Sequence, residues 1–186
     1  FSSYDNKNRR IVCSDFNNDR VVSFNLELEE YNLILDGKYE EEFLRRPSGI
    51  DLDENGNCFI SNRSSGVISK FDKNLNFIKN LDTVKPLHRP ACIGKYNSSD
   101  KAFLAIFERS NLKKPYLSIY TLSNNKSRLS LIKKIKNLVI KDAQDLTISN
   151  NGILYIADTL NRRILMLDPI KETCSEVDVV KISNNP

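Results

Sequence analysis

The chain has 186 residues, of which 40% are hydrophobic, and it carries a formal net charge of +4. This length and composition predict one soluble globular domain with a core of its own. No run of about 18 apolar residues occurs, which argues against a transmembrane helix and membrane insertion, and a single histidine without any C-x-x-C pair argues against a zinc site.

In chain order, the first clear strand signal is the apolar triplet at residues 11–13, which ends at a polar anchor, Asp15. Apolar residues return six and nine positions after this anchor. The frame recurs at residues 58–60 with the anchor Asn62, and at residues 154–156 with the anchor Asp158. These anchors are about 47 residues apart or twice that, so a further copy is expected between the last two.

The expected third copy is present in an altered form. Residues 89–93 repeat the pattern of residues 46–50, and residues 102–104 repeat the triplet at 58–60. The offset between the two copies then grows by about five residues, which indicates an insertion between Phe107 and Pro115. The inserted loop is basic.

Each copy contains four short strands separated by turn residues, and this repeat length is typical of propeller blades. The predicted fold is therefore all-β, a β-propeller of four-stranded blades, with the triplets as equivalent second strands. A solenoid of β-repeats is the alternative. The expected blades cover residues 1–44, 45–87, 88–140 and 141–186.

The stretches RPSGIDLDENGNCFISNRSSGVISKFD and ISNNGILYIADTLNRRILMLD resemble the NHL repeat over essentially the whole chain. The last copy departs from the pattern with Asp145 where the second has Gly49, and the third departs with Cys92 and its long loop. YWTD propeller repeats are a second resemblance, carried by VCSDFNNDRVVSFNLE. Propellers that resemble this family have six blades, so the chain is expected to be partial, with the remaining blades of the same propeller as its nearest partners.

An enzymatic role is not expected, and neither is a cofactor. Amidating lyases with similar propellers need several histidines for metal, whereas this chain has one. Lactonase-type propellers hold calcium with acidic and amide side chains, for which Asp51, Asp145 and Asn62 are candidates, but such residues at repeat positions also cap turns. The cysteines fit buried apolar positions, with Cys13 and Cys58 as free thiols, which favours a reducing compartment.

Charge is unevenly placed along the chain, with a basic, acid-free stretch at residues 109–141 and an acidic one at residues 27–54. Alternating strand directions bring the loops between second and third strands to the same face as the segments that enter each blade. This face is expected to be basic and to bind partners, with Glu40, Glu41, Glu42 and Glu108 nearby, although the same charges could be ordinary solvated loop residues. The candidate binding residues are Arg20, Arg45, Arg46, Arg63, His88, Arg89, Arg109, Asn111, Lys113, Lys114, Lys141, Arg162 and Arg163.

The resemblance implies a recognition module for protein or RNA partners, like the propeller at the C-terminus of tripartite-motif ubiquitin ligases. Ubiquitin transfer would then belong to a RING domain outside this sequence, and the expected location is the cytoplasm. The alternative is an extracellular or receptor-type propeller that mediates adhesion between proteins.

Overall fold

The computed structural model describes residues 1–27, 31–36, 44–98, 101–109, 115–122, 128–135 and 140–177. Within these residues the chain forms four antiparallel sheets, each of four strands that follow one another in sequence. The predicted all-β propeller fold is confirmed. The two short 3-10 turns are η1 (Phe16–Asn18) and η2 (Thr159–Asn161).

The strands follow the four sequence repeats. The first sheet contains β1 (Ser2–Asp5), β2 (Arg10–Asp15), β3 (Arg20–Asn25) and β4 (Tyr31–Asp36). The second contains β5 (Pro47–Leu52), β6 (Cys58–Asn62), β7 (Val67–Phe71) and β8 (Phe77–Asn80). The third contains β9 (Pro90–Ser98), β10 (Lys101–Glu108), β11 (Tyr116–Leu122) and β12 (Leu129–Ile135), and the fourth contains β13 (Ala143–Ile148), β14 (Leu154–Asp158), β15 (Arg163–Asp168) and β16 (Thr173–Glu176).

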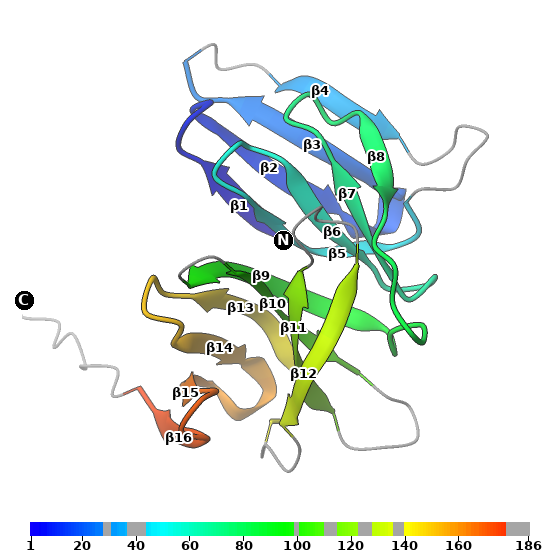
Figure 1. Ribbon diagram of the computed structural model, residues 1–186. Coiled ribbons are helices and arrows are strands. Elements are labelled where there is room, and N and C mark those ends of the chain that lie inside the picture. Colours follow the sequence, from blue (N-terminus) through cyan, green and yellow to red (C-terminus); the bar gives the residue numbers. More distant parts are fainter. Residues whose placement is uncertain are drawn as a thin grey trace, which may run out of the picture.

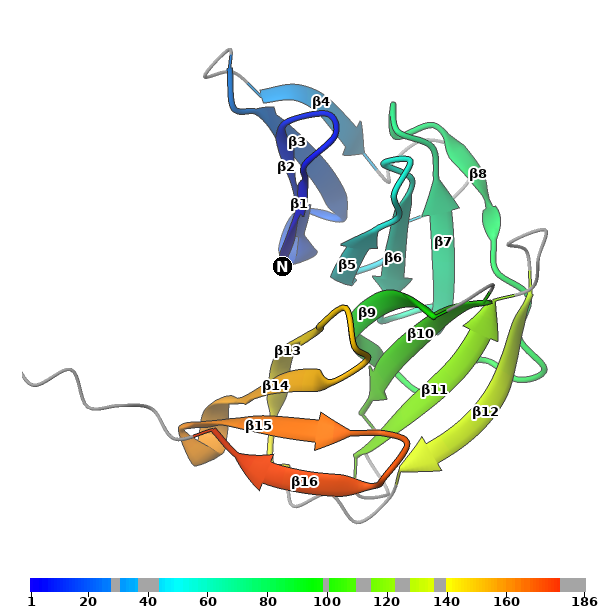
Figure 2. The ribbon, with the colours of Figure 1, turned by 60° about the vertical axis from the view of Figure 1, so that its left-hand side comes forward.

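The four sheets stand side by side along an arc (Figures 1 and 2). Figure 2 shows the first strands β1, β5, β9 and β13 on the inside of the arc and the fourth strands on the outside. Contacts between sheets are made mainly by these inner strands, with β5 against β1 and β2, and β9 against β5, β6 and β13. Each sheet is therefore a blade that packs on the next blade in the chain.

The core consists of three apolar clusters, one between each pair of neighbouring sheets. Alternation along a strand explains why the middle sheets contribute to two clusters. In β6, Cys58 and Ile60 pack toward the first sheet, whereas Phe59 between them packs toward the third. Continuous apolar triplets are required in second strands because both of their faces are buried.

The second strand of the third sheet is longer than the sequence frame indicates. The triplet at residues 102–104 lies in β10 as expected, but the strand continues to Glu108 with a register shift after Phe107. The residue that occupies the position of Asn62 and Asp158 is thus Glu108, two positions beyond the one that the repeat offset predicts. The extra residues lengthen the hairpin of β9 and β10, which has 9 and 8 residues where β5 and β6 have 6 and 5.

Candidate functional site

The loops between second and third strands lie on the same face as the segments that lead into each blade. Backbone hydrogen bonds join the two sets directly, from the Arg63 N–H to the Arg46 carbonyl at 3.2 Å and from the Arg109 N–H to the Arg89 carbonyl at 3.4 Å. In the fourth sheet the Thr159 N–H donates to the carbonyl of Asp142 at 3.0 Å. We call this surface the entry face; its described segments are 16–19, 44–46, 63–66, 81–89, 140–142 and 159–162.

The polar anchor at the end of each later second strand holds the entry segment in place. Asn62 Oδ1 accepts the Arg45 N–H at 3.1 Å, and Glu108 Oε2 accepts the His88 N–H at 2.8 Å. In the last sheet, Asp158 Oδ1 accepts the N–H of Lys141 at 3.0 Å. The anchors thereby present the basic residues of the entry segments at equivalent places on three blades.

The expectation that Glu108 is a surface acid is wrong. Its side chain is buried and accepts hydrogen bonds from the hydroxyls of Ser118 at 2.6 Å and Tyr116 at 3.1 Å, besides the N–H of His88. Burial, together with the Glu108 charge, raises the pKa of Tyr120 to about 12. The Glu108 carboxylate therefore serves as a hydrogen-bond acceptor inside the protein and is not an acid of the surface.

Three of the candidate arginines are held in ion pairs. Arg20 Nε lies 2.7 Å from Asp15, Arg163 Nε lies 3.1 Å from Asp158, and Arg109 Nη2 lies 2.6 Å from Asp142. Arg109 also donates to the carbonyl of Ala143 at 2.8 Å, so it joins the third sheet to the fourth. Arg20, Arg163 and Arg109 therefore have structural contacts that account for their positions.

A short motif explains two of these pairs. The pattern D-x-x-N-x-R occurs at residues 5–10, 15–20 and 158–163, and in each copy the Asp accepts hydrogen bonds from the Asn and Arg side chains. The fifth residue of each copy has a positive φ. The sequence contains this signal, and it could have identified Arg20 and Arg163 as loop-closing residues.

A different arrangement surrounds Arg63, which begins the loop after β6. The guanidinium carbons of Arg46 and Arg63 lie 5.8 and 5.6 Å from the centroid of the Phe16 ring. Burial and the positive charges of Arg109, Arg89 and Arg46 lower the pKa of Arg63, although Asp142 acts in the opposite direction. We call Arg46, Arg63 and Arg89 the arginine cluster; they come from the second and third entry segments and the loop between β6 and β7.

The remaining candidates are distributed over the same face. Arg45, His88, Lys141 and Arg162 are exposed there. Asn111, Lys113 and Lys114, which belong to the inserted loop, lie outside the described residues. The structure thus brings Arg46, Arg63 and Arg89 together and places Lys141 and Arg162 on the fourth sheet.

A hollow of about 570 Å³ opens beside His88, the neighbour of Arg89 in the chain. Its walls are partly apolar and partly basic, and the Lys134 amino group lies 4.5 Å from the centroid of the Tyr116 ring. Such a combination suits a peptide that offers both acidic and apolar side chains. The lining residues are Thr83, Val84, Lys85, Pro86, His88, Glu108, Tyr116, Tyr120, Leu129, Ser130, Leu131 and Lys134.

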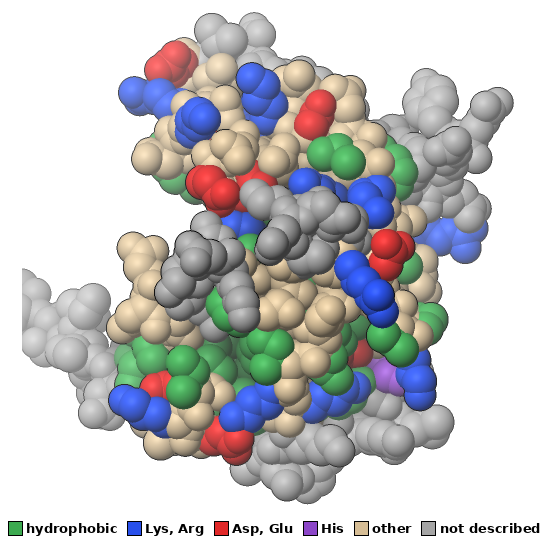
Figure 3. Space-filling view, in the orientation of Figure 1, with side chains coloured by type: hydrophobic (Ala, Val, Ile, Leu, Met, Phe, Trp, Pro, Cys, Tyr) green, Lys and Arg blue, Asp and Glu red, His purple; other side chains and the backbone are tan. Residues whose placement is uncertain are grey.

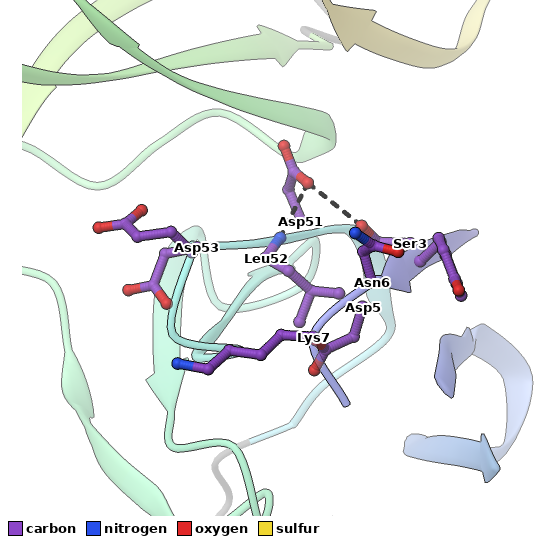
Figure 4. A pocket seen from close by; sticks show the side chains of 9 residues that line it. Ser3, Asp5, Asn6, Lys7, Asp51, Leu52 and Asp53 are labelled. Atoms are coloured by element: carbon purple, nitrogen blue, oxygen red, sulfur yellow. Dashed lines mark hydrogen bonds between the residues drawn. The ribbon is translucent and has the colours of Figure 1, made fainter. Parts of the chain in front are cut away.

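The opposite face has a second hollow of about 570 Å³, between the first two sheets (Figure 4). Its acids are used within the protein. Asp53 accepts the N–H groups of Asn55 and Asn57 in a turn, and Asp5 bonds with Arg10 at 2.9 Å. The acidic character of this hollow is therefore explained by turn formation and an internal ion pair.

Asp51 lies in this second hollow and joins three inner strands. It accepts the Ser3 hydroxyl at 3.2 Å and the Lys95 N–H at 2.6 Å, and burial raises its pKa. Asn62, by contrast, is at the other end of the blade, where it binds Arg45. In the part of the chain that the structure describes, no three His, Cys, Asp or Glu side chains are grouped as metal ligands.

Hydrophobic side chains gather on the part of the surface formed by the third and fourth sheets (Figure 3). The two sheets also enclose a hollow of about 420 Å³, which includes Phe103, Ile132 and Ile170. Among the described residues, no helix is long and apolar enough to cross a membrane.

No protein-family model and no curated protein sequence matches this chain. Several solved structures do. The chain is 10% identical to streptogramin B lyase with a TM-score of 0.59, 11% identical to hydrazine synthase of Kuenenia stuttgartiensis with 0.65, and 18% identical to a chain of a nidogen/laminin complex with 0.65. The matches cover 96%, 95% and 95% of this chain but 54%, 48% and 61% of those chains. The chain thus spans about half the length of the structures it matches, and at these identities the likeness shows the propeller fold alone.

Proposed function

We propose that this chain is a non-catalytic recognition module of NHL type, which binds an acidic segment of a partner protein through the entry face. The observation that carries the proposal is the arginine cluster on the same face as a hollow lined by Lys85, His88 and Lys134, where His88 precedes Arg89 in the chain. Positive charge next to a partly apolar depression favours a segment that carries both acidic and apolar side chains.

A protein partner is favoured over RNA by the aromatic residues of this face. Recognition of single-stranded RNA commonly uses open aromatic rings for base stacking. Phe16 already has two guanidinium groups over its ring, and Phe107 is buried in the cluster between the third and fourth sheets. The likeness to a chain from the nidogen/laminin complex agrees with a propeller that serves in protein contacts.

In this proposal the module selects the substrate of a tripartite-motif-type ubiquitin ligase in the cytoplasm. The buried free thiols of Cys58 and Cys92 suit a reducing compartment, and burial raises the pKa of Cys58 to about 12, which makes it unreactive. An extracellular adhesion propeller is the alternative.

The test compares two double variants that carry the same change in charge. Arg46→Glu with Arg89→Glu alters the entry face, whereas Lys7→Glu with Lys73→Glu alters exposed turns of the opposite face. Binding to a pool of acidic peptides with interspersed apolar residues is measured at low and high salt. We expect the first variant to lose about tenfold or more in affinity and most of the salt dependence, while the second keeps both.

Equal losses in both variants, or no loss in either, would contradict the proposal. A random RNA pool provides the other arm. Tight RNA binding that is lost only in the entry-face variant, without any peptide binding, would overturn the protein assignment in favour of RNA.

A further inference from the structure

Arg63 differs from the paired arginines of the entry face because, among the described residues, no carboxylate lies within ion-pair distance of its guanidinium, although the charge of Asp142 acts on it. Within the described residues its guanidinium forms no ion pair, and its buried Nε has no hydrogen-bond partner. Arg20, Arg109 and Arg163 each have an aspartate within 3.1 Å. A half-buried guanidinium without a carboxylate is costly and therefore calls for a ligand.

The loop after β6 lacks the ion pair that closes two of the corresponding loops. In the D-x-x-N-x-R loops at residues 15–20 and 158–163, the aspartate that ends the second strand binds the arginine that begins the third. After β6 the anchor is neutral Asn62, the positive-φ position is Gly66, and Val67 stands where the other loops have arginine. Asn62 donates its amide N–H to the Ser69 hydroxyl at 2.7 Å. As a neutral anchor it offers no carboxylate to Arg63, which occupies the position of Phe16 and Thr159 in the other two loops.

The protein nevertheless holds Arg63 in one place. Its N–H is bonded to the Arg46 carbonyl, and the guanidinium lies over Phe16 together with that of Arg46. Arg46 and Arg89 have φ values of 50° and 46°, a left-handed conformation that is unusual for arginine and that directs both entry segments. Like charges are therefore gathered by a built framework and are not merely adjacent on a flexible surface.

We propose that Arg63 is the centre of an oxyanion site on the arginine cluster, and that it binds the phosphate monoester of a phosphoserine or phosphothreonine in the partner protein. The inference rests on the proposed function and specifies its ligand. A planar guanidinium can donate two parallel hydrogen bonds to phosphate oxygens, and a phosphate monoester brings close to two negative charges and three acceptor oxygens. A carboxylate or a phosphodiester brings only one negative charge to Arg63, and a carboxylate has only two acceptor oxygens.

The experiment uses three acidic peptide pools that are identical except for one position, which holds phosphoserine, serine or glutamate. The unaltered chain is expected to bind the phosphoserine pool about tenfold or more tightly than the serine pool, and inorganic phosphate should compete. Arg63→Gln should remove this preference, and Arg63→Lys should remove most of it because an ammonium lacks the paired donors. Lys73→Gln, which changes an exposed lysine of the opposite face, should keep it.

Thermal unfolding of each variant establishes that the fold is intact. Equal binding of the three pools, or an intact preference in Arg63→Gln, would overturn the phosphate site. Tighter binding of a 5′-phosphorylated oligoribonucleotide than of the phosphoserine pool would overturn the phosphoprotein ligand.

The two proposals fail separately. If all pools bind equally and the Arg46→Glu, Arg89→Glu variant loses them all, the acidic-segment function stands without the phosphate site. If only the phosphoserine pool binds and Arg63→Gln abolishes that binding, the phosphate site stands and general recognition of acidic segments falls.

Discussion

At the scale of single residues, the anchor at the end of each second strand controls two loops at once. Asp158 accepts hydrogen bonds from the backbone N–H groups of Lys141 and Asp142 and also from the side chains of Asn161 and Arg163. Burial of its carboxyl opposes ionisation, but these donors outweigh burial and lower the pKa of Asp158 below its usual 3.8. One carboxylate thus fixes the entry segment and closes the following loop.

We predict that Asp158→Ala destabilises the chain by about 2–4 kcal/mol at neutral pH, because it leaves several partly buried donors without their acceptor. Since the folded-state pKa is lowered, this contribution is present above the unfolded pKa and is lost as the pH falls through the folded one. The free energy of unfolding, measured in urea from pH 7 to pH 3, should therefore differ less between the two proteins at acid pH.

Asp15→Ala is the matched control. It removes the corresponding anchor of the first sheet, whose ion pair with Arg20 is more exposed, and should cost much less. A similar loss in both variants would show that burial of the Asp158 side chain adds nothing to the effect of its hydrogen bonds.

The sequence alone predicted the contacts of the anchors and of the basic residues only in part. The repeat frame identified Asp15, Asn62 and Asp158 as equivalent, and the structure confirms that all three end second strands. It did not identify Glu108, because the burial of that side chain depends on Tyr116 and Tyr120 across the blade. Likewise, basic residues were predicted on one face, but which of them are neutralised depends on loop geometry that charge counting does not contain.

At the scale of elements, β5 and β9 of neighbouring blades approach each other closely. A Cβ atom built on Gly49 would lie 2.6 Å from both the Cys92 Cα and the Ile93 nitrogen, which are backbone atoms. Gly94 on β9 is also crowded, but its nearest neighbours are side-chain carbons of Leu146 and Ile148, at 2.6 and 2.8 Å. The first contact cannot relax without moving a strand, whereas the second can relax by rotamer changes.

We predict that Gly49→Ala destabilises the chain by about 3 kcal/mol or more and Gly94→Ala by about 1 kcal/mol. Chemical denaturation of the two variants side by side provides the measurement. Equal losses, or a larger loss for Gly94→Ala, would contradict the close packing of β5 on β9.

The same contact bears on the residue that the last copy has at this position. The last copy has Asp145, an exposed residue on β13, where the second has Gly49. Among the described residues no further sheet packs against the fourth one in the way that β9 packs against β5. The repeat pattern of the sequence showed that Asp145 departs from it. The structure supplies the physical reason, because the fourth sheet is the last described blade and Asp145 has no following described strand against it.

At the scale of the whole molecule, the two end blades each have one apolar face that no described sheet covers. Ile68 and Ile164 occupy the same repeat position, yet Ile68 is 0% exposed between two sheets whereas Ile164 is 41% exposed. Met166 beside it is 39% exposed, and on the first sheet Tyr4 and Phe24 are 52% and 39% exposed. Surfaces of this kind favour association.

We predict that the 186-residue chain self-associates as its concentration rises, through these end faces. The double variant Ile164→Ser with Met166→Lys should remain monomeric over the same range in sedimentation velocity. Val84→Lys, which changes an 80% exposed residue away from the end faces, should behave like the unaltered chain. A monodisperse parent, or a variant that still associates, would argue against this use of the end faces.

The order of strands in the four sheets also bears on how the chain reaches its fold. Each of the described strands pairs only with its neighbours in sequence, and each described sheet is completed before the next begins. Pairing of these strands needs no distant part of the chain, so the loop-closure entropy that slows many β-proteins stays small. During synthesis on the ribosome, the blades could therefore fold one after another. Each new blade would pack on the blade already folded while the rest of the chain is still being translated.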